Sequence, residues 1–140
     1  MKTRGFTLIE MLVTIAIIGI LSAIALFALQ GIREQARDAK RKSDLETIRS
    51  GLEVYRSDCN IYPAAITPGG SLTGNCPTLN TYIQTVPSDS QTTARQYYYR
   101  RISNTTYELC ARLENVPSPA VACGGNCGTL GACNYRVTSP

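Results

Sequence analysis

Residues 5–29 read GFTLIEMLVTIAIIGILSAIALFAL, and this stretch decides how the rest of the chain is organised. A short basic head, with Lys2 and Arg4, precedes it. From Met11 to Leu29, 19 residues pass without a charge. A helix rises about 1.5 Å per residue and the apolar core of a bilayer is about 30 Å thick. The sequence therefore predicts a membrane-spanning helix over residues 6–29.

Glu10 distinguishes this segment from an ordinary signal peptide or a plain membrane anchor. A secretory signal has an apolar region of about 7–15 residues and an A-x-A cleavage site. Ala23-Ile24-Ala25 supplies the A-x-A, but the apolar run is longer than a signal needs. Neither alternative explains a carboxylate in an apolar helix, where charge is costly and usually functional.

The motif Gly5-Phe6-Thr7-Leu8-Ile9-Glu10 resembles the class III leader junction of type IV prepilins and type II secretion pseudopilins. The resemblance implies a leader at residues 1–5, cut after Gly5 by a prepilin peptidase, and N-methylation of Phe6. It also implies that Glu10 pairs with the Phe6 ammonium of a neighbouring subunit, because an unpaired charge in a dry filament core is expensive. The implied partners are other copies of the chain and related pilins, the peptidase, an inner-membrane assembly platform, and membrane lipid before assembly.

Six cysteines follow the apolar segment. An even number in a small polar domain predicts a disulfide framework formed outside the cytoplasm. A zinc site is the alternative, but the last three cysteines are spaced C-x3-C-x5-C and the chain has no histidine. Cys59 and Cys76 bracket one loop and form the favoured pair, while the other four cysteines allow three pairings. The cysteines are Cys59, Cys76, Cys110, Cys123, Cys127 and Cys133.

The basic residues and the cysteines predict opposite orientations in the membrane. Lys and Arg concentrate on the cytoplasmic side of a span. More of them follow the apolar segment, at positions 33, 37, 40, 41 and 42, than precede it. The cysteines and the leader junction instead place the C-terminal part outside the cytoplasm. We follow the latter and expect a bacterial membrane protein with a cytoplasmic N-terminus before assembly, and then a periplasmic or cell-surface filament.

Residues 30–57 are predicted to continue the helix as an amphipathic segment. Apolar residues recur at spacings of three and four, and the charges between them predict a solvated face with an Asp38–Lys42 pair. The helix is expected to end near Asp58, where residues 58–63 resemble the D-x-x-x-Y-P segment of many pseudopilins. The apolar positions are Ile32, Ala36, Leu45, Ile48, Leu52 and Tyr55.

Residues 58–140 are predicted to form a disulfide-bonded globular domain. A loop is expected over 64–77, a short helix over 79–86, and a hairpin of residues 96–102 and 107–113 with its turn at 103–106. Alternate residues from Tyr107 to Leu113 should cover the helix. A loop over 116–133 and an edge strand over 134–137 complete the chain. The predicted fold class is α+β: a long N-terminal α-helix with a small antiparallel sheet packed on its C-terminal half.

No catalytic site, cofactor or metal site is predicted. Without histidine there is no Ser-His-Asp triad, and the glycine-rich residues 124–128 lack the lysine of a phosphate-binding loop. Type II secretion relatives bind calcium in their C-terminal loops. Here the acids after Asp58 are Asp89, Glu108 and Glu114, which are far apart in the sequence.

The charge of the chain does not favour a nucleic-acid partner. The formal net charge is +4, and about +2 remains once Lys2 and Arg4 leave with the leader. The sequence therefore favours a structural subunit of a type IV pilus-like or type II secretion pseudopilus filament. The alternative is a monomeric, membrane-anchored extracellular binding module, in which Glu10 is incidental.

Overall fold

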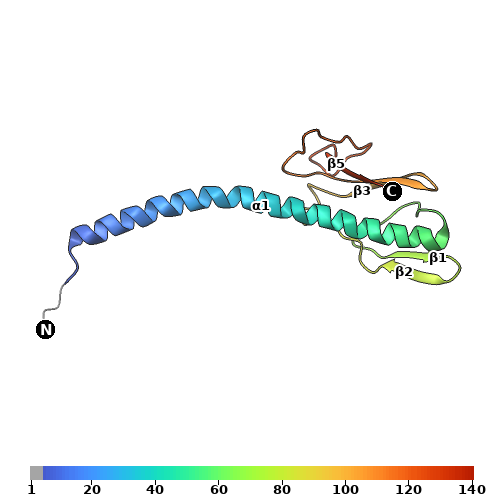
Figure 1. Ribbon diagram of the computed structural model, residues 1–140, viewed down its shortest axis with the longest axis horizontal. Coiled ribbons are helices and arrows are strands. Elements are labelled where there is room, and N and C mark those ends of the chain that lie inside the picture. The colour runs from blue at the N-terminus through green and yellow to red at the C-terminus, as the bar shows by residue number, and fades with distance from the viewer. Residues whose placement is uncertain (1–4) are drawn as a thin grey trace. The chain divides into compact units, whose positions relative to one another are not determined.

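The computed structural model describes residues 5–140, except the side chains at 27, 28 and 30, and opens with one long helix, α1 (Leu8–Cys59) (Figure 1). Residues 1–4, which make up most of the predicted leader, lie outside the described residues. Two compact units meet at the boundary between Ala36 and Arg37. Five strands follow α1: β1 (Leu72–Asn75), β2 (Leu79–Ile83), β3 (Tyr98–Ser103), β4 (Thr106–Ala111) and β5 (Tyr135–Thr138).

The first unit exposes nearly all of its large apolar side chains. Phe6 and Leu8 are about four-fifths exposed, at 78% and 77%. By length and composition alone, α1 contains one stretch apolar enough to cross a membrane, with a mean hydropathy of 2.8. Because a soluble surface rarely shows so long an apolar face, this unit requires an apolar environment.

The end of α1 is set by Asn60. Its φ of 58° lies in the left-handed region, and its amide donates to the Arg56 carbonyl at 2.8 Å. Asparagine tolerates this conformation at a helix C-terminus, and Pro63 prevents the helix from resuming. The helix thus ends at Cys59, within one residue of the prediction.

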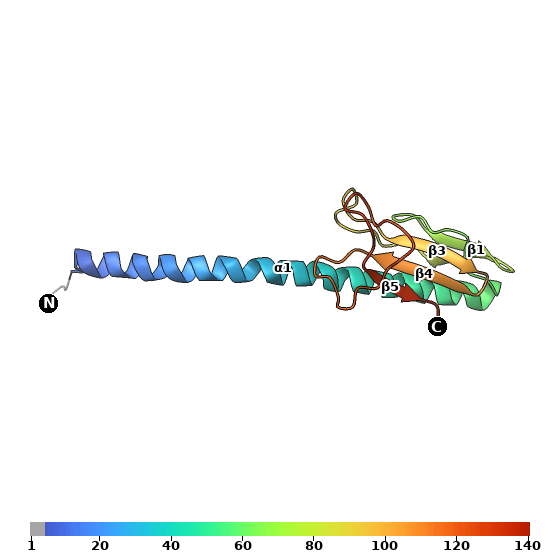
Figure 2. The same cartoon turned by 90° about the horizontal axis from the view of Figure 1, so that it is seen from above.

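Two antiparallel sheets pack on the C-terminal part of α1, which confirms the predicted α+β class. Strands β1 and β2 form a hairpin, and β3, β4 and β5 form a three-stranded sheet with β4 in the middle, as Figure 2 shows. In the three-stranded sheet Leu109 lies opposite Tyr99 on one side and Val137 on the other. The predicted 96–113 hairpin and C-terminal edge strand are confirmed.

The core lies between α1 and these sheets. Leu45, Ile48 and Leu52 are completely buried and follow the three-and-four spacing seen in the sequence. They meet the face of β4 that carries Tyr107 and Leu109, while Cys110, between Leu109 and Ala111, belongs to a second buried cluster with Cys127 and Cys133. The remaining fully or nearly buried core residues are Tyr62, Leu72, Ile83, Val86, Tyr97, Ala111 and Val137.

Two local predictions were wrong. Residues 79–86 were expected to be helical, but residues 79–83 form β2 and pair with residues 72–75 of the supposed loop. A short apolar run fits both helix and strand patterns, so its secondary structure depends on whether a neighbouring segment can pair with it as a strand. Here Ile83 of β2 lies opposite Leu72 of β1 and enters the core.

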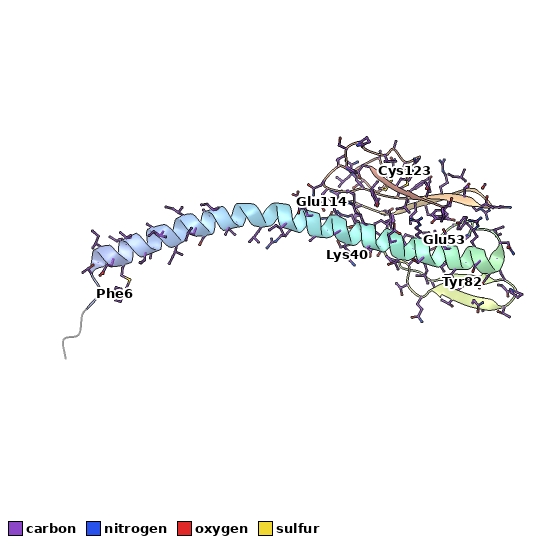
Figure 3. The ribbon with its side chains drawn as sticks, in the orientation of Figure 1. Phe6, Lys40, Glu53, Tyr82, Glu114 and Cys123 are labelled. Atoms are coloured by element: carbon purple, nitrogen blue, oxygen red, sulfur yellow. A yellow bond between two sulfur atoms is a disulfide. The ribbon has the colours of Figure 1, made fainter. Side chains whose placement is uncertain are left out.

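The disulfides fasten the loops of the second unit. Cys59 pairs with Cys76 and ties the end of α1 to the β1–β2 turn. Cys110 on β4 pairs with Cys123, and Cys127 pairs with Cys133 within the following loop. Figure 3 shows Cys123 on the outer loop, away from α1.

Candidate assembly site and loop clamp

The predicted assembly residues lie at the first turn of α1. Thr7 precedes the helix, and its amide and hydroxyl donate to the Glu10 carboxylate at 2.8 and 2.7 Å. The Glu10 amide donates in return to the Thr7 hydroxyl at 3.3 Å. This reciprocal arrangement is a capping box, which satisfies amides that the helix leaves without partners. The T-x-x-E spacing in the sequence carries this signal, and sequence reasoning missed it.

The surroundings of Glu10 are apolar. Phe6, Ile9, Val13 and Thr14 border a shallow hollow of about 370 Å³ that also includes Glu10. Gly5 and Phe6 lie before the helix and are exposed (Figure 3). The structure therefore brings the Phe6 backbone and the Glu10 carboxylate to the same end of α1 and leaves the Gly5–Phe6 bond accessible.

A buried arginine lies at the start of the second unit. The side chain of Arg41 is only 3% exposed. Its Nη1 donates to Asp38 Oδ1 and to Glu114 Oε1, both at 2.8 Å, and its Nε donates to Asp89 Oδ2. We call Asp38, Asp89 and Glu114 the three-carboxylate cage. It joins α1 to the loops that follow β2 and β4.

This cage corrects the prediction of a solvated charged face. Asp38 pairs with Arg41 rather than with Lys42, whose ammonium lies 5.5 Å from the centre of the Tyr135 ring. Lys40 does remain exposed, and Figure 3 shows it on the opposite side of α1 from Glu114. The helical charges therefore divide into an inward set that binds loops and an outward set.

Backbone amides strengthen the cage. Asp38 accepts hydrogen bonds from the Glu114 and Asn115 amides at 2.9 and 2.8 Å. Burial alone would raise the pKa of Asp38, but these amides and Arg41 outweigh it and lower the pKa. Burial likewise opposes the charge of Arg41, and its carboxylate partners still raise the pKa of the guanidinium. Both groups stay ionised in the folded chain.

Arg37 adds a second cation on the rim of the cage. Its Nε donates to Glu114 Oε1 at 2.7 Å, and its Nη2 donates to the other oxygen, which is a bidentate pair. Hydrogen bonds from Arg37, and then from Arg41, lower the pKa of Glu114 to about 2 despite its burial. Glu114 is therefore a carboxylate at every physiological pH.

Tyrosine hydroxyls make a second set of polar contacts with α1. Tyr97 donates to Asp44 at 2.8 Å, and Tyr62 donates to Glu53 at 2.9 Å. Burial raises the pKa of Tyr97 and Tyr62, so both hydroxyls keep their protons. Tyr97 is buried, while Tyr98 and Tyr99 are half-buried in β3, so these tyrosines serve the sheet rather than form an exposed patch.

Comparison with known proteins agrees with the N-terminal geometry. Residues 1–26 match the family described as "Prokaryotic N-terminal methylation motif". The chain is 40% identical over 63 residues to "Type II secretion system core protein G" of Pectobacterium carotovorum subsp. carotovorum, and 40% identical over 62 residues to that of Escherichia coli K12. The N-terminal part of this chain is therefore similar to the pilin and pseudopilin family.

The region that the chain shares with these relatives is limited. The Pectobacterium match covers 45% of the chain and 40% of the relative, and the Escherichia coli match covers 44% and 43%. A third core protein G, from Dickeya chrysanthemi, is 37% identical over 71 residues, which are 51% of the chain and 46% of the relative. The chain thus spans less than half the length of these relatives. No solved structure matches it.

Proposed function

We propose that this chain is a non-catalytic structural subunit of a filament, either a type II secretion pseudopilus or a related type IV pilus-like fibre. One observation carries the proposal: a family methylation motif opens a helix whose apolar side chains are exposed. Three relatives are named as core proteins of type II secretion systems, which supports the pseudopilus form.

In this function the first unit moves from one apolar environment, the membrane, to another, the filament core. Before assembly residues 6–29 span the membrane, and after assembly they pack against the same segments of neighbouring subunits. The hydrophobic effect keeps these side chains out of water in both environments but does not itself favour the filament over the membrane, because lipid tails are as apolar as the side chains. The attraction between subunits then comes from close packing of the apolar side chains exposed along α1. Residues 30–57 continue the helix outward, and residues 58–140 form the domain on the filament surface.

Leader removal creates the charge that Glu10 needs. A prepilin peptidase cuts after Gly5, and the same enzyme methylates the new Phe6 amine. The Glu10 carboxylate of one subunit then pairs with the Phe6 ammonium of its neighbour. The capping contacts with Thr7 hold that carboxylate at the helix end, ready for the incoming charge. A slipped register would leave both charges unpaired in an apolar core, so the pair favours one register.

In this function the chain first lies in a bacterial inner membrane with its N-terminus in the cytoplasm, and afterwards in a periplasmic or surface filament. Its partners are copies of itself, related pilins and the assembly platform. The six paired cysteines support a non-cytoplasmic second unit. In the alternative, a monomeric anchored binding module, Glu10 acts only as a helix cap.

Two substitutions separate these functions. Thr7→Ala removes the cap partner but keeps the carboxylate, whereas Glu10→Ala removes both the cap and the charge. In cells with the assembly machinery, Glu10→Ala should lower the yield of sheared fibres by at least about tenfold, because an unpaired ammonium repeats in every subunit. Thr7→Ala should retain most fibres, and both variants should insert and be cleaved normally. Equal losses for the two variants would show that capping is the role of Glu10, and an unmodified chain that forms no fibres would contradict the filament.

A further inference from the structure

Three carboxylates from distant parts of the chain surround one guanidinium inside the second unit. Asp38 lies on α1, Asp89 follows β2, and Glu114 follows β4. Asp89 is 48 residues and Glu114 is 73 residues from Arg41 in the sequence. Their side chains are 2% and 12% exposed, and that of Asp38 is 7% exposed. So many buried acids require a cation to balance them.

The cage has the composition of a site for a hard cation. Carboxylate oxygens are the ligands that calcium prefers, and here they come from two loops and a helix. The family resemblance implies a calcium ion in the C-terminal loops. The residues present do not fit that ion, because the guanidinium takes the centre and already engages oxygens of all three carboxylates. The remaining oxygens are also engaged: Asp38 Oδ2 by the Asn115 amide, Asp89 Oδ1 by the Gln91 amide and Glu114 Oε2 by Arg37.

We propose that the three-carboxylate cage is a cation site whose resident cation is the Arg41 guanidinium. The loops after β2 and β4 are therefore fastened to α1 by a cation that is part of the chain. A planar guanidinium gives several directional hydrogen bonds, which a single metal ion would replace with coordination bonds. The fold of the second unit then needs no divalent metal, and removing Arg41 opens the same carboxylates to one.

The consequence for the protein is independence from the metal content of its surroundings. A subunit with a calcium clamp loses this stabilisation when calcium is scarce, since the stabilisation from a bound ion grows with the logarithm of one plus the ratio of its concentration to Kd. A covalently attached guanidinium is present at every calcium concentration. The second unit therefore keeps the same stability in calcium-poor and calcium-rich media.

Thermal unfolding of the full chain in detergent, with disulfides intact, tests this site. The tyrosine near-ultraviolet circular dichroism reports the second unit. For the unmodified chain, 5 mM calcium or 5 mM EDTA should move Tm by less than about 1 °C. Arg41→Ala should unfold at least about 5 °C lower in EDTA and recover at least about 3 °C in 5 mM calcium, because the vacated cage now binds the ion. If Arg41→Ala folds only with calcium, its refolding yield gives the same readout.

Arg95→Ala is the matched control. Arg95 is half-buried, whereas Arg41 is fully buried, and it donates to the Gln91 side chain at 3.1 Å and to the Arg112 carbonyl at 3.0 Å. Its loss should lower Tm with no recovery in calcium. The proposal is overturned if calcium stabilises the unmodified chain as much as Arg41→Ala. It is also overturned if Arg41→Ala gains nothing from calcium, including the case in which it stays unfolded in both media.

Discussion

At the scale of single residues, Gly51 decides how closely β2 can approach the helix. A Cβ at this position would lie 2.2 Å from Cγ1 of Ile83. Gly74 on β1 plays the same part against Tyr55, where a Cβ would lie 2.7 Å from the ring. The hairpin can therefore pack closely on α1 because Gly51 leaves room for Ile83 and Gly74 leaves room for Tyr55. This close approach explains why α1 contains a glycine, which is otherwise unfavourable inside a helix.

Gly51→Ala should destabilise the second unit even though alanine is the better helix former. Overpacking a filled core costs about 1–3 kcal/mol, which exceeds the roughly 1 kcal/mol that alanine gains over glycine in a helix. Ser50→Ala on the exposed side of the same turn is the control and should change stability by less than about 0.5 kcal/mol. Denaturant unfolding followed by circular dichroism measures both, and a Gly51→Ala variant more stable than the unmodified chain would contradict the close contact.

At the scale of elements, the loops are held by acids whose ionisation matters. The pKa of Glu114 is about 2 in the folded chain, against 4.5 for an ordinary glutamate. A depressed folded pKa stabilises the fold above the unfolded value, and that stability is lost as the pH falls toward the folded value. The window for Glu114 therefore runs from about pH 4.5 down to about pH 2. Asp38, whose pKa is also lowered, acts in the same direction.

Acid should therefore weaken the contacts that hold the loops to α1, whereas these contacts should stay intact at neutral pH. Between pH 5 and pH 2.5 the free energy of unfolding should fall by roughly 2–3 kcal/mol through Glu114 alone, since each unit of pKa shift is worth about 1.4 kcal/mol. Glu114→Gln should be less stable at pH 7 and should flatten this part of the profile. Urea unfolding at several pH values provides the measurement. Parallel profiles for the variant and the unmodified chain would show that Glu114 is not responsible.

The elements that sequence could predict are those with local signals. The β3–β4 hairpin shows alternation and aromatic residues around a polar turn, so both strands could be placed. The β1–β2 hairpin could not, because β1 is only Leu-Thr-Gly-Asn and its stability comes from Gly51, Tyr55 and a disulfide. The three-carboxylate cage could not be predicted either, because its acids are far apart in the sequence and come together only in the folded chain. The Thr7–Glu10 capping box was local and could have been found.

At the scale of the whole molecule, the disulfides close loops of different lengths. Cys59–Cys76 spans 17 residues of sequence and Cys127–Cys133 spans 6. On the chain-entropy model a longer closed loop restricts the unfolded chain more. Replacing Cys59 and Cys76 together by serine should thus cost roughly 3 kcal/mol, and replacing Cys127 and Cys133 should cost about 1 kcal/mol less. Denaturant midpoints of the two double variants give the comparison, and a larger loss from the shorter loop would reverse the expected order.

Processing connects the N-terminus to the fate of the whole chain. In the proposed function the Phe6 ammonium exists only after cleavage at Gly5, so a chain that cannot be cut has no charge to offer the neighbouring Glu10. Gly5→Leu should place a bulky side chain at the cut site and leave full-length chains in the membrane fraction. The second unit should still fold and form its disulfides, because it lies entirely after residue 36.

The measurement is mass spectrometry of the N-terminus together with fibre yield. The unmodified chain should begin at N-methylated Phe6, whereas Gly5→Leu should keep residues 1–5 and form no fibres. Gly5→Ala is the control, because a small side chain should still allow cleavage and assembly. If Gly5→Leu is cut and methylated at Phe6 like the unmodified chain, the junction lies elsewhere. If it remains uncut and still yields normal fibres, the ammonium is not needed and the pairing with Glu10 is wrong.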